Sequence, residues 1–335
     1  MLNYIIIANS SYDIFILIFG GLTVFLFGLN LTKENLKSIA NKKLEYFIFN
    51  CTNTPLKAFV VGIITTILIQ SSSGVTALVV TFIAAGYLTF KQGLGIMIGA
   101  NVGTCTTAFL FGINIESHAL TIIFVASCLA FFITNDTKKV ICQAILGIGF
   151  IFLGLQLMGF GFDLVGKSPS FMKIMKEYAN KNFPALIIGI LLTFIIQSSS
   201  AIIGLLEQIY AADLISLKPA ILLLLGSNIG TTLTGLIATI ATNKEAKKAV
   251  VANILFNILG TIIFIIFLSP FASLLGYLKH QELIKTPQLM IAYAHLIFNV
   301  VTVFLAYIFF NQLIHLTNLC FNINPRNKKI IQLYG

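Results

Sequence analysis

One tetrapeptide occurs twice in this chain of 335 residues, each time inside a strongly apolar run. The copies are Gln70-Ser71-Ser72-Ser73 and Gln197-Ser198-Ser199-Ser200, and twelve apolar-rich residues precede each of them. In surroundings without water, every unpaired polar group costs several kcal/mol. Four adjacent polar side chains in such a run need a physical reason, and a bound ligand is the simplest one.

Composition indicates an all-α polytopic membrane protein. Hydrophobic residues make up 58% of the chain and charged residues only 10%, which is outside the range of soluble domains. Lysines and arginines gather in short segments between apolar runs, as at the ends of membrane helices, so the net charge of +10 does not indicate nucleic-acid binding. No basic residue precedes the first apolar run, so we expect the first membrane helix to be retained rather than cleaved. The five cysteines form no close pair and predict neither a metal site nor a disulfide framework.

The tetrapeptides belong to a longer internal repeat. At an offset of 127 residues, residues 58–107 align without a gap on residues 185–234, with 18 of the 50 positions identical. We therefore expect one transmembrane domain over 1–335, with repeat 1 at about 13–134 and repeat 2 at about 140–268. An extra C-terminal helix at about 291–312 and a short basic tail would follow.

The apolar run around each tetrapeptide is too long for one membrane crossing. Residues 58–90 carry no charge, and as a single helix they would measure about 50 Å against a hydrocarbon core of about 30 Å. A break at the tetrapeptide gives two arms of half-membrane depth, which predicts a re-entrant helical hairpin here and at 185–217. Non-helical backbone at that depth is acceptable only where it lines a cavity.

Hairpins that do not cross leave three crossings in each repeat, and an odd number inverts the second copy. The expected fold therefore has inverted-topology repeats in the cell (inner) membrane, with the N-terminus outside and the C-terminus cytoplasmic. In the alternative arrangement each tetrapeptide segment crosses the membrane. The distribution of basic residues does not distinguish the two arrangements.

A second motif follows each hairpin at the same spacing. Residues 99–107 and 226–232 are rich in glycine, asparagine and threonine, and because glycine lets the backbone unwind we expect a broken transmembrane helix in each repeat. The alternative is that glycine and threonine only allow tight helix packing. The candidate ligands for sodium or substrate are Asn101, Thr104, Thr106, Asn228, Thr231 and Thr232.

A serine-rich break that opens a half-helix can bind an anion. Serine is favoured at helix N-caps, and the free backbone N–H groups and the positive end of the helix dipole can hold a phosphate without any arginine or lysine. Two breaks that face each other would form one site near the midplane. In a site without fixed positive charge, bound sodium ions would compensate the anion, and hydroxyl and carbonyl oxygens suit that ion. The alternative is that the serines only bond to neighbouring helices.

Further polar residues are candidates for coupling or support. Glu207 is the only acid inside either hairpin, with Val80 at the matching place in the first copy; it is either a cation ligand or proton carrier, or a residue near the outer rim. Thr66 and Thr193 match each other one turn before the glutamines, and we expect them to bond back to their own helices.

A shorter sequence similarity relates residues 252–257 to residues 294–299. In both segments the polar residues are four apart and so share one helix face, which makes Asn257, His295 and Asn299 candidate supporting residues. The chain has no phosphate loop, paired carboxylates or hydrolytic triad, so we expect no enzymatic activity and no cofactor apart from a transported ion.

The duplicated Gln-Ser-Ser-Ser, the segments Gly-Ala-Asn-Val-Gly-Thr and Gly-Ser-Asn-Ile-Gly-Thr, and the Phe-Asn helices resemble the sodium/phosphate cotransporter family over residues 20–312. The resemblance to this type II Na⁺/Pi cotransporter-like family implies inverted repeats, a phosphate and sodium site formed by the two hairpins, and sodium-driven uptake of inorganic phosphate. Many bacterial members also carry a C-terminal PhoU-like domain, and we expect a bacterial member without it.

The expected partners are inorganic phosphate, Na⁺ and the lipid bilayer, with no nucleic acid and with a homodimer left open. Two alternatives remain at this point. One is a sodium- or proton-coupled transporter of another anion, such as sulfate or a dicarboxylate. The other is a membrane phosphate sensor that does not transport.

Overall fold

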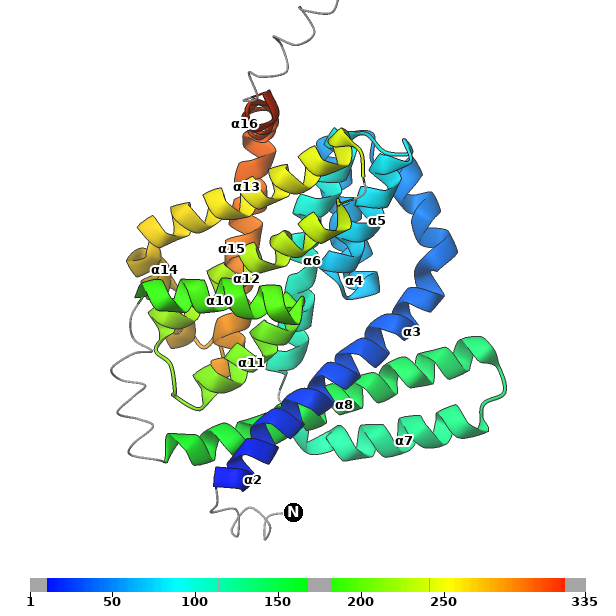
Figure 1. Cartoon of the computed structure of the whole chain (residues 1–335). Coiled ribbons are helices and arrows are strands. Elements are labelled where there is room, and N and C mark those ends of the chain that lie inside the picture. Colours follow the sequence, from blue (N-terminus) through cyan, green and yellow to red (C-terminus); the bar gives the residue numbers. More distant parts are fainter. Residues whose placement is uncertain (1–10, 114, 168–181, 241, 323–335) are drawn as a thin grey trace, which may run out of the picture.

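The computed structural model describes residues 11–113, 115–167, 182–240 and 242–322, and every regular element in these ranges is a helix (Figure 1). The prediction of an all-helical membrane protein is confirmed, because six of the described helices are long and apolar enough to cross a bilayer. These candidate spans are Tyr12–Ile39, Phe90–Gly112, Asp136–Gly166, Leu217–Ala238, Lys244–Ile266 and Pro287–Ile308.

The first long rod consists of α2 (Ser11–Phe15), the π-helical segment η1 (Ile16–Gly20) and α3 (Gly21–Asn50). Figure 1 shows α3 running beside α8 (Asp136–Gly166), with α7 (Ala119–Phe132) on the other side of α8. The sequence has its first full-length apolar run at 13–31 and predicts a cytoplasmic polar linker after it, carrying Lys33, Lys37, Lys42, Lys43 and Lys57. The structure instead continues α3 to Asn50. Residues 29–50 contain no glycine or proline and many strong helix formers, so the helix continues.

The two hairpins break where the sequence predicts. The first consists of α4 (Pro55–Ile69) and α5 (Ser72–Ala84), and the second of α10 (Asn182–Ile196) and α11 (Ser199–Ala211), so all four boundaries repeat at the same offset of 127 residues. Each break contains a glutamine in the left-handed region, with φ of 56° at Gln70 and 57° at Gln197. The breaks therefore share one backbone geometry.

The expected broken helices are not observed. Both α6 (Phe90–Gly112) and α12 (Leu217–Ala238) continue without interruption through their glycine motifs. The glycines instead allow close helix packing, because a Cβ atom at Gly99 would collide with the carbonyl oxygen of Phe59 on α4. A Cβ atom at Gly226 would collide in the same way with the carbonyl oxygen of Leu186 on α10. The alternative interpretation, that these glycines allow tight helix packing, agrees with the structure.

The C-terminal part of the described chain comprises α13 (Lys244–Ile266), α14 (Leu268–His280), α15 (Pro287–Ile308) and α16 (Phe310–Asn322). The expected helix over 291–312 is thus α15, which begins and ends four residues earlier than predicted and is followed by a separate helix. The predicted basic tail lies outside the described residues. Helix α15 packs against both α6 and α11, which places it between the two hairpin regions (Figure 1).

Candidate functional site

The first break is held by hydrogen bonds to its glutamine. The backbone N–H of Gln70 donates to the carbonyl oxygen of Thr66 at 2.7 Å, which ends α4. Thr107 of α6 donates to Gln70 Oε1 at 2.7 Å, and Gln70 Nε2 donates to the carbonyl oxygen of Ile67 at 2.8 Å. Ser71 then caps α5, its hydroxyl accepting from the backbone N–H of Gly74 at 3.1 Å.

The second break repeats this backbone pattern. Gln197 donates its backbone N–H to the carbonyl oxygen of Thr193 at 2.7 Å, and Ser198 caps α11 by accepting from the N–H of Ala201 at 3.3 Å. Lys33 of α3 adds a contact that the first break lacks, because its Nζ donates to Ser198 Oγ at 3.4 Å. Lys33 of α3 thus contacts Ser198, the N-cap residue of α11 in the second hairpin.

A small cavity connects Lys33 with the first break. Its volume is about 100 Å³, whereas one water molecule needs about 10–15 Å³. Lys33, Gln70 and Thr107 supply charge and polarity, and most of the remaining lining is apolar. Residues of α3, the first break and α6 therefore line one cavity. Lys33, in the lining of this cavity, also contacts Ser198 of the second break.

The sequence analysis did not single out Lys33, whose contact with Ser198 places a positive charge beside the second break. A signal was present, because the α3 residues that line the cavity, Leu29, Thr32, Lys33 and Leu36, follow the i, i+3, i+4, i+7 pattern of one helix face. The pattern alone does not show which neighbour that face contacts. Among the described residues, Lys33 has no salt-bridge partner.

The remaining serines of the two tetrapeptides lie in the first turns of α5 and α11. Ser72, Ser199 and Ser200 are buried, and Ser73 is half-buried. Their hydroxyls make no hydrogen bond with other described residues. These groups, together with the helix N-termini behind them, are therefore available to a ligand.

The candidate asparagines and threonines of α6 and α12 bond back to their own helices. Thr104 donates to the carbonyl oxygen of Ala100 at 3.0 Å and Thr231 to that of Ser227 at 2.9 Å. A back-bond uses the proton of a hydroxyl and leaves lone pairs, so a role in holding sodium stays a prediction. Four further residues back-bond through their side chains: Asn101, Thr106, Asn228 and Thr232.

Thr66 and Thr193 do not bond back to their own helices, so that prediction is wrong. Thr193 donates to Ser227 Oγ at 2.9 Å, which links α10 to α12. The buried hydroxyl of Thr66 has no partner among the described residues, because Ala100 occupies the place in the first repeat that corresponds to Ser227. The two matching threonines therefore make different contacts in the two repeats.

Glu207 lies in the interior and not at the outer rim, because its side chain is fully buried. Neither of its carboxylate oxygens has a hydrogen-bond partner among the described residues. The neighbouring Gln208 donates instead to Glu116 Oε1 at 3.1 Å, and burial raises the pKa of the Glu116 carboxyl while this hydrogen bond opposes the shift. A buried acid without a partner needs a proton or a cation to neutralise it.

The candidate supporting residues Asn257, His295 and Asn299 form a second polar region on α13 and α15. Asn299 donates to the carbonyl oxygen of His295 at 2.9 Å and contacts Cys105 of α6. Asn257 donates to the carbonyl oxygen of Asn253 at 3.0 Å. The side-chain oxygens of Asn253, Asn257 and Asn299 and Nδ1 of His295 are buried and have no hydrogen-bond partner in the part of the chain that the structure describes. None of these residues lines the cavity around Lys33.

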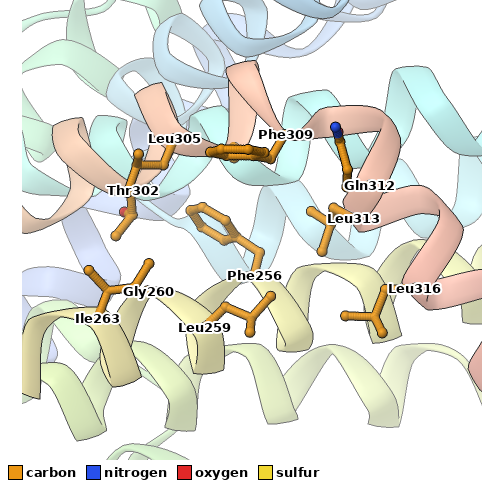
Figure 2. A pocket seen from close by; sticks show the side chains of 11 residues that line it. Phe256, Leu259, Gly260, Ile263, Thr302, Leu305, Phe309, Gln312, Leu313 and Leu316 are labelled. Atoms are coloured by element: carbon orange, nitrogen blue, oxygen red, sulfur yellow. The ribbon is translucent and has the colours of Figure 1, made fainter. Parts of the chain in front are cut away.

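A larger hollow between α13, α15 and α16 is apolar. Figure 2 shows Phe256, Leu313 and Phe309 lining this hollow, whose volume is about 280 Å³. Thr302 and Gln312 are the polar residues in its lining, and several lining side chains, such as Leu259, are partly exposed at the protein surface. A hydrated anion would lose its solvation in this hollow without gaining charged or hydrogen-bonding partners, so we do not assign substrate to the hollow.

The six candidate spans define a multi-pass helical membrane protein, and three of them, which contain residues of α3, α6 and α8, line the cavity around Lys33. The chain belongs to the Na⁺/Pi-cotransporter family, whose model matches residues 24–159 and 165–309. The uncharacterized protein YqeW of Bacillus subtilis is 34% identical over 283 residues, which cover 84% of this chain and 90% of YqeW. No solved structure matches the chain.

Two further relatives have names that mention phosphate. The "Putative inorganic phosphate export protein YjbB" of Salmonella typhimurium is 24% identical over 280 residues, which cover 83% of this chain and 50% of YjbB. The human sodium-dependent phosphate transport protein 2B is 33% identical over 94 residues, which cover 28% of this chain and 14% of that protein. This chain thus spans about half the length of YjbB.

Proposed function

We propose that this chain is a sodium-coupled secondary active transporter that imports inorganic phosphate across the plasma (inner) membrane. The observation that carries the proposal is the pair of serine-capped helix breaks, which share one backbone geometry at Gln70 and Gln197 and begin α5 and α11 with buried serines. Helix N-termini with free hydroxyls are suited to a phosphate. Family membership and the name of the human relative support phosphate and sodium as the transported pair.

Inverted-topology repeats and re-entrant hairpins are part of this proposal. The helix boundaries of both hairpins repeat at one offset, and neither α4 nor α5 is long enough to cross a bilayer alone. Three crossings per repeat and one final crossing put the two termini on opposite sides of the membrane, and the positive-inside rule then favours the N-terminus outside and the C-terminus cytoplasmic. The transporter domain would comprise repeat 1 at about 13–134, repeat 2 at about 140–268 and the final helices.

In this mechanism, the serines and glutamines of the two breaks bind phosphate, and hydroxyl, amide and carbonyl oxygens near them bind sodium. The oxygen ligands we assign to sodium or substrate lie on the following helices α6 and α12, namely Asn101, Thr104, Thr106, Asn228, Thr231 and Thr232. Sodium lowers the electrostatic cost of holding the anion, so each ligand raises the affinity for the other by the same factor. Glu207 is the candidate for an additional cation, either sodium or a proton.

The direction of net flux is the part of the proposal with a specific rival. YjbB is named as an export protein, and that name favours phosphate export as the second candidate function. A coupled carrier moves substrate in the direction that the combined gradients dictate, so both directions must be measured. A carrier of sulfate or a dicarboxylate on the same fold is separated by competition with unlabelled anions.

The decisive experiment is radiolabelled phosphate uptake into proteoliposomes, with an inward sodium gradient set against an equal choline gradient. The variant is Ser72→Ala with Ser199→Ala, and Ser38→Ala, an exposed serine on α3, is the matched control. We expect accumulation that needs sodium, is lost in the double variant and is kept in the control. Equal uptake with sodium and choline contradicts sodium coupling, and efflux alone under either gradient favours export.

A further inference from the structure

We propose that Lys33 is a phosphate-binding residue whose fixed positive charge makes part of the phosphate affinity independent of sodium. This inference rests on the proposed function, because it assigns a further residue to the same substrate site. It departs from the mechanism expected of serine-capped breaks alone, in which sodium ions supply all of the compensating charge.

The position of Lys33 is the first argument. Its helix α3 is separate from both hairpins in the chain, yet its side chain contacts the second hairpin at Ser198 and lines the cavity beside Gln70 of the first. It is thus a charged side chain with contacts toward both tetrapeptides. A phosphate held between the two breaks would lie within reach of its ammonium group.

The unused hydrogen-bonding capacity of Lys33 is the second argument. An ammonium group has three donors, and the described residues accept only one hydrogen bond from it, at the long distance of 3.4 Å. Lysine binds phosphate as a point charge, and a hydrogen bond to an ionised oxygen is shorter and stronger than one to a serine hydroxyl. Phosphate oxygens would therefore replace a weak contact with strong ones.

The charge balance around the cavity is the third argument. Its lining comes from α3, the first break, α6 and α8 and contains no acidic residue. The adjacent acid on α3, Glu34, is exposed and accepts a hydrogen bond from Asn30 at 3.1 Å. A cation in a mostly apolar cavity without a counter-charge is costly, and an anionic substrate supplies that counter-charge.

The test is equilibrium binding of radiolabelled inorganic phosphate to the full-length protein in nanodiscs, in sodium and in choline buffer. Lys33→Arg keeps the charge, Lys33→Met removes charge and donors, and Lys33→Gln removes the charge but keeps a donor for Ser198. Lys37→Met is the matched control, because Lys37 lies one turn further along α3 and is exposed. Thermal unfolding without phosphate shows whether each variant is folded.

We expect wild type, Lys33→Arg and Lys37→Met to bind phosphate in choline. Lys33→Met and Lys33→Gln should bind at least tenfold more weakly there, with sodium restoring a larger fraction of their affinity than it adds to wild type. The inference is overturned if Lys33→Gln binds as wild type does, which would reduce Lys33 to positioning Ser198. It is also overturned if wild-type binding in choline is absent while sodium-dependent binding and uptake persist, a result that leaves the proposed function intact. Absence of phosphate binding in both buffers overturns the proposed function as well.

Discussion

Thr193 donates a hydrogen bond of 2.9 Å to Ser227, whereas the matching Thr66 of the first repeat has a buried hydroxyl that no described residue contacts by a hydrogen bond. The difference arises because Ala100 takes the place of Ser227 in the first repeat. The second hairpin is thereby tied to α12 by a polar contact that is missing between α4 and α6. The first repeat retains an unpaired oxygen close to its break.

The two threonines should therefore respond differently to removal of the hydroxyl. We expect Thr193→Val to lower the free energy of unfolding by about 1–3 kcal/mol, because it leaves the buried Ser227 hydroxyl unpaired. Thr66→Val should be neutral or stabilising, since it removes a group that has no partner. Thermal unfolding read with a thiol-reactive dye measures both, because Cys105 and Cys142 are buried in the folded protein. Equal losses would mean that Thr66 has a partner in the membrane-embedded protein, and a loss confined to sodium buffer would identify that partner as sodium.

The glycines of the α6 motif should matter for packing and not for unwinding. Gly99→Ala places a methyl group against the backbone of Phe59, so we expect destabilisation of about 1–3 kcal/mol from overpacking. Gly276→Ala is the control, because among the described residues no atom beyond the adjoining helix backbone lies within 4 Å of the added carbon. In the interior of α14 it should stabilise by about 0.5–1 kcal/mol. Thermal unfolding of both variants tests this, and a neutral Gly99→Ala would contradict the close approach of α4 and α6.

Polar residues inside apolar runs predicted the hairpin breaks well, because such residues are too costly to place in a continuous apolar helix without purpose. The same reasoning failed for Gly99 and Gly226, since a glycine serves an unwound backbone and a close helix contact equally well. The choice between these roles depends on the neighbouring helix, which the local sequence does not specify.

Lys33 illustrates a second limit of the sequence. A charge after a long apolar run normally marks the end of a membrane segment, so residues after 31 were expected to form a polar linker. The structure instead continues α3 and directs one face of it into the protein core. Helical periodicity identifies that face, but only the tertiary arrangement shows that it borders Gln70 and Ser198.

The serine caps should tolerate other cap residues but not a negative charge. Asn and Asp are as good at N-caps as serine, so Ser71→Asn and Ser71→Asp should preserve α5 and unfold at similar temperatures. If this cap faces bound phosphate, the added charge of aspartate should weaken phosphate binding at least tenfold relative to asparagine, a difference of about 1.4 kcal/mol. Equilibrium binding of radiolabelled phosphate measures the ratio. Equal affinities for the two variants would show that the first break does not face the anion.

Glu207 provides the sharpest test of what the protein couples to phosphate. Its carboxylate is buried without a hydrogen-bond partner in the described structure, and a proton or a cation must neutralise it. If that cation is sodium, Glu207→Gln replaces a charged oxygen ligand with a neutral one of the same size. We expect the sodium concentration for half-maximal phosphate uptake to rise about tenfold, corresponding to about 1.4 kcal/mol.

Asp213→Asn is the matched control for this prediction, because Asp213 is an exposed acid at the end of the same hairpin and its backbone φ of 55° suits asparagine. Its sodium dependence should equal that of wild type. Proton coupling makes the opposite prediction, namely wild-type uptake without sodium under an imposed pH gradient and loss of that uptake in Glu207→Gln. Unchanged sodium and pH dependence in Glu207→Gln would exclude both coupling roles and leave Glu207 as a neutral acid buried for structural reasons.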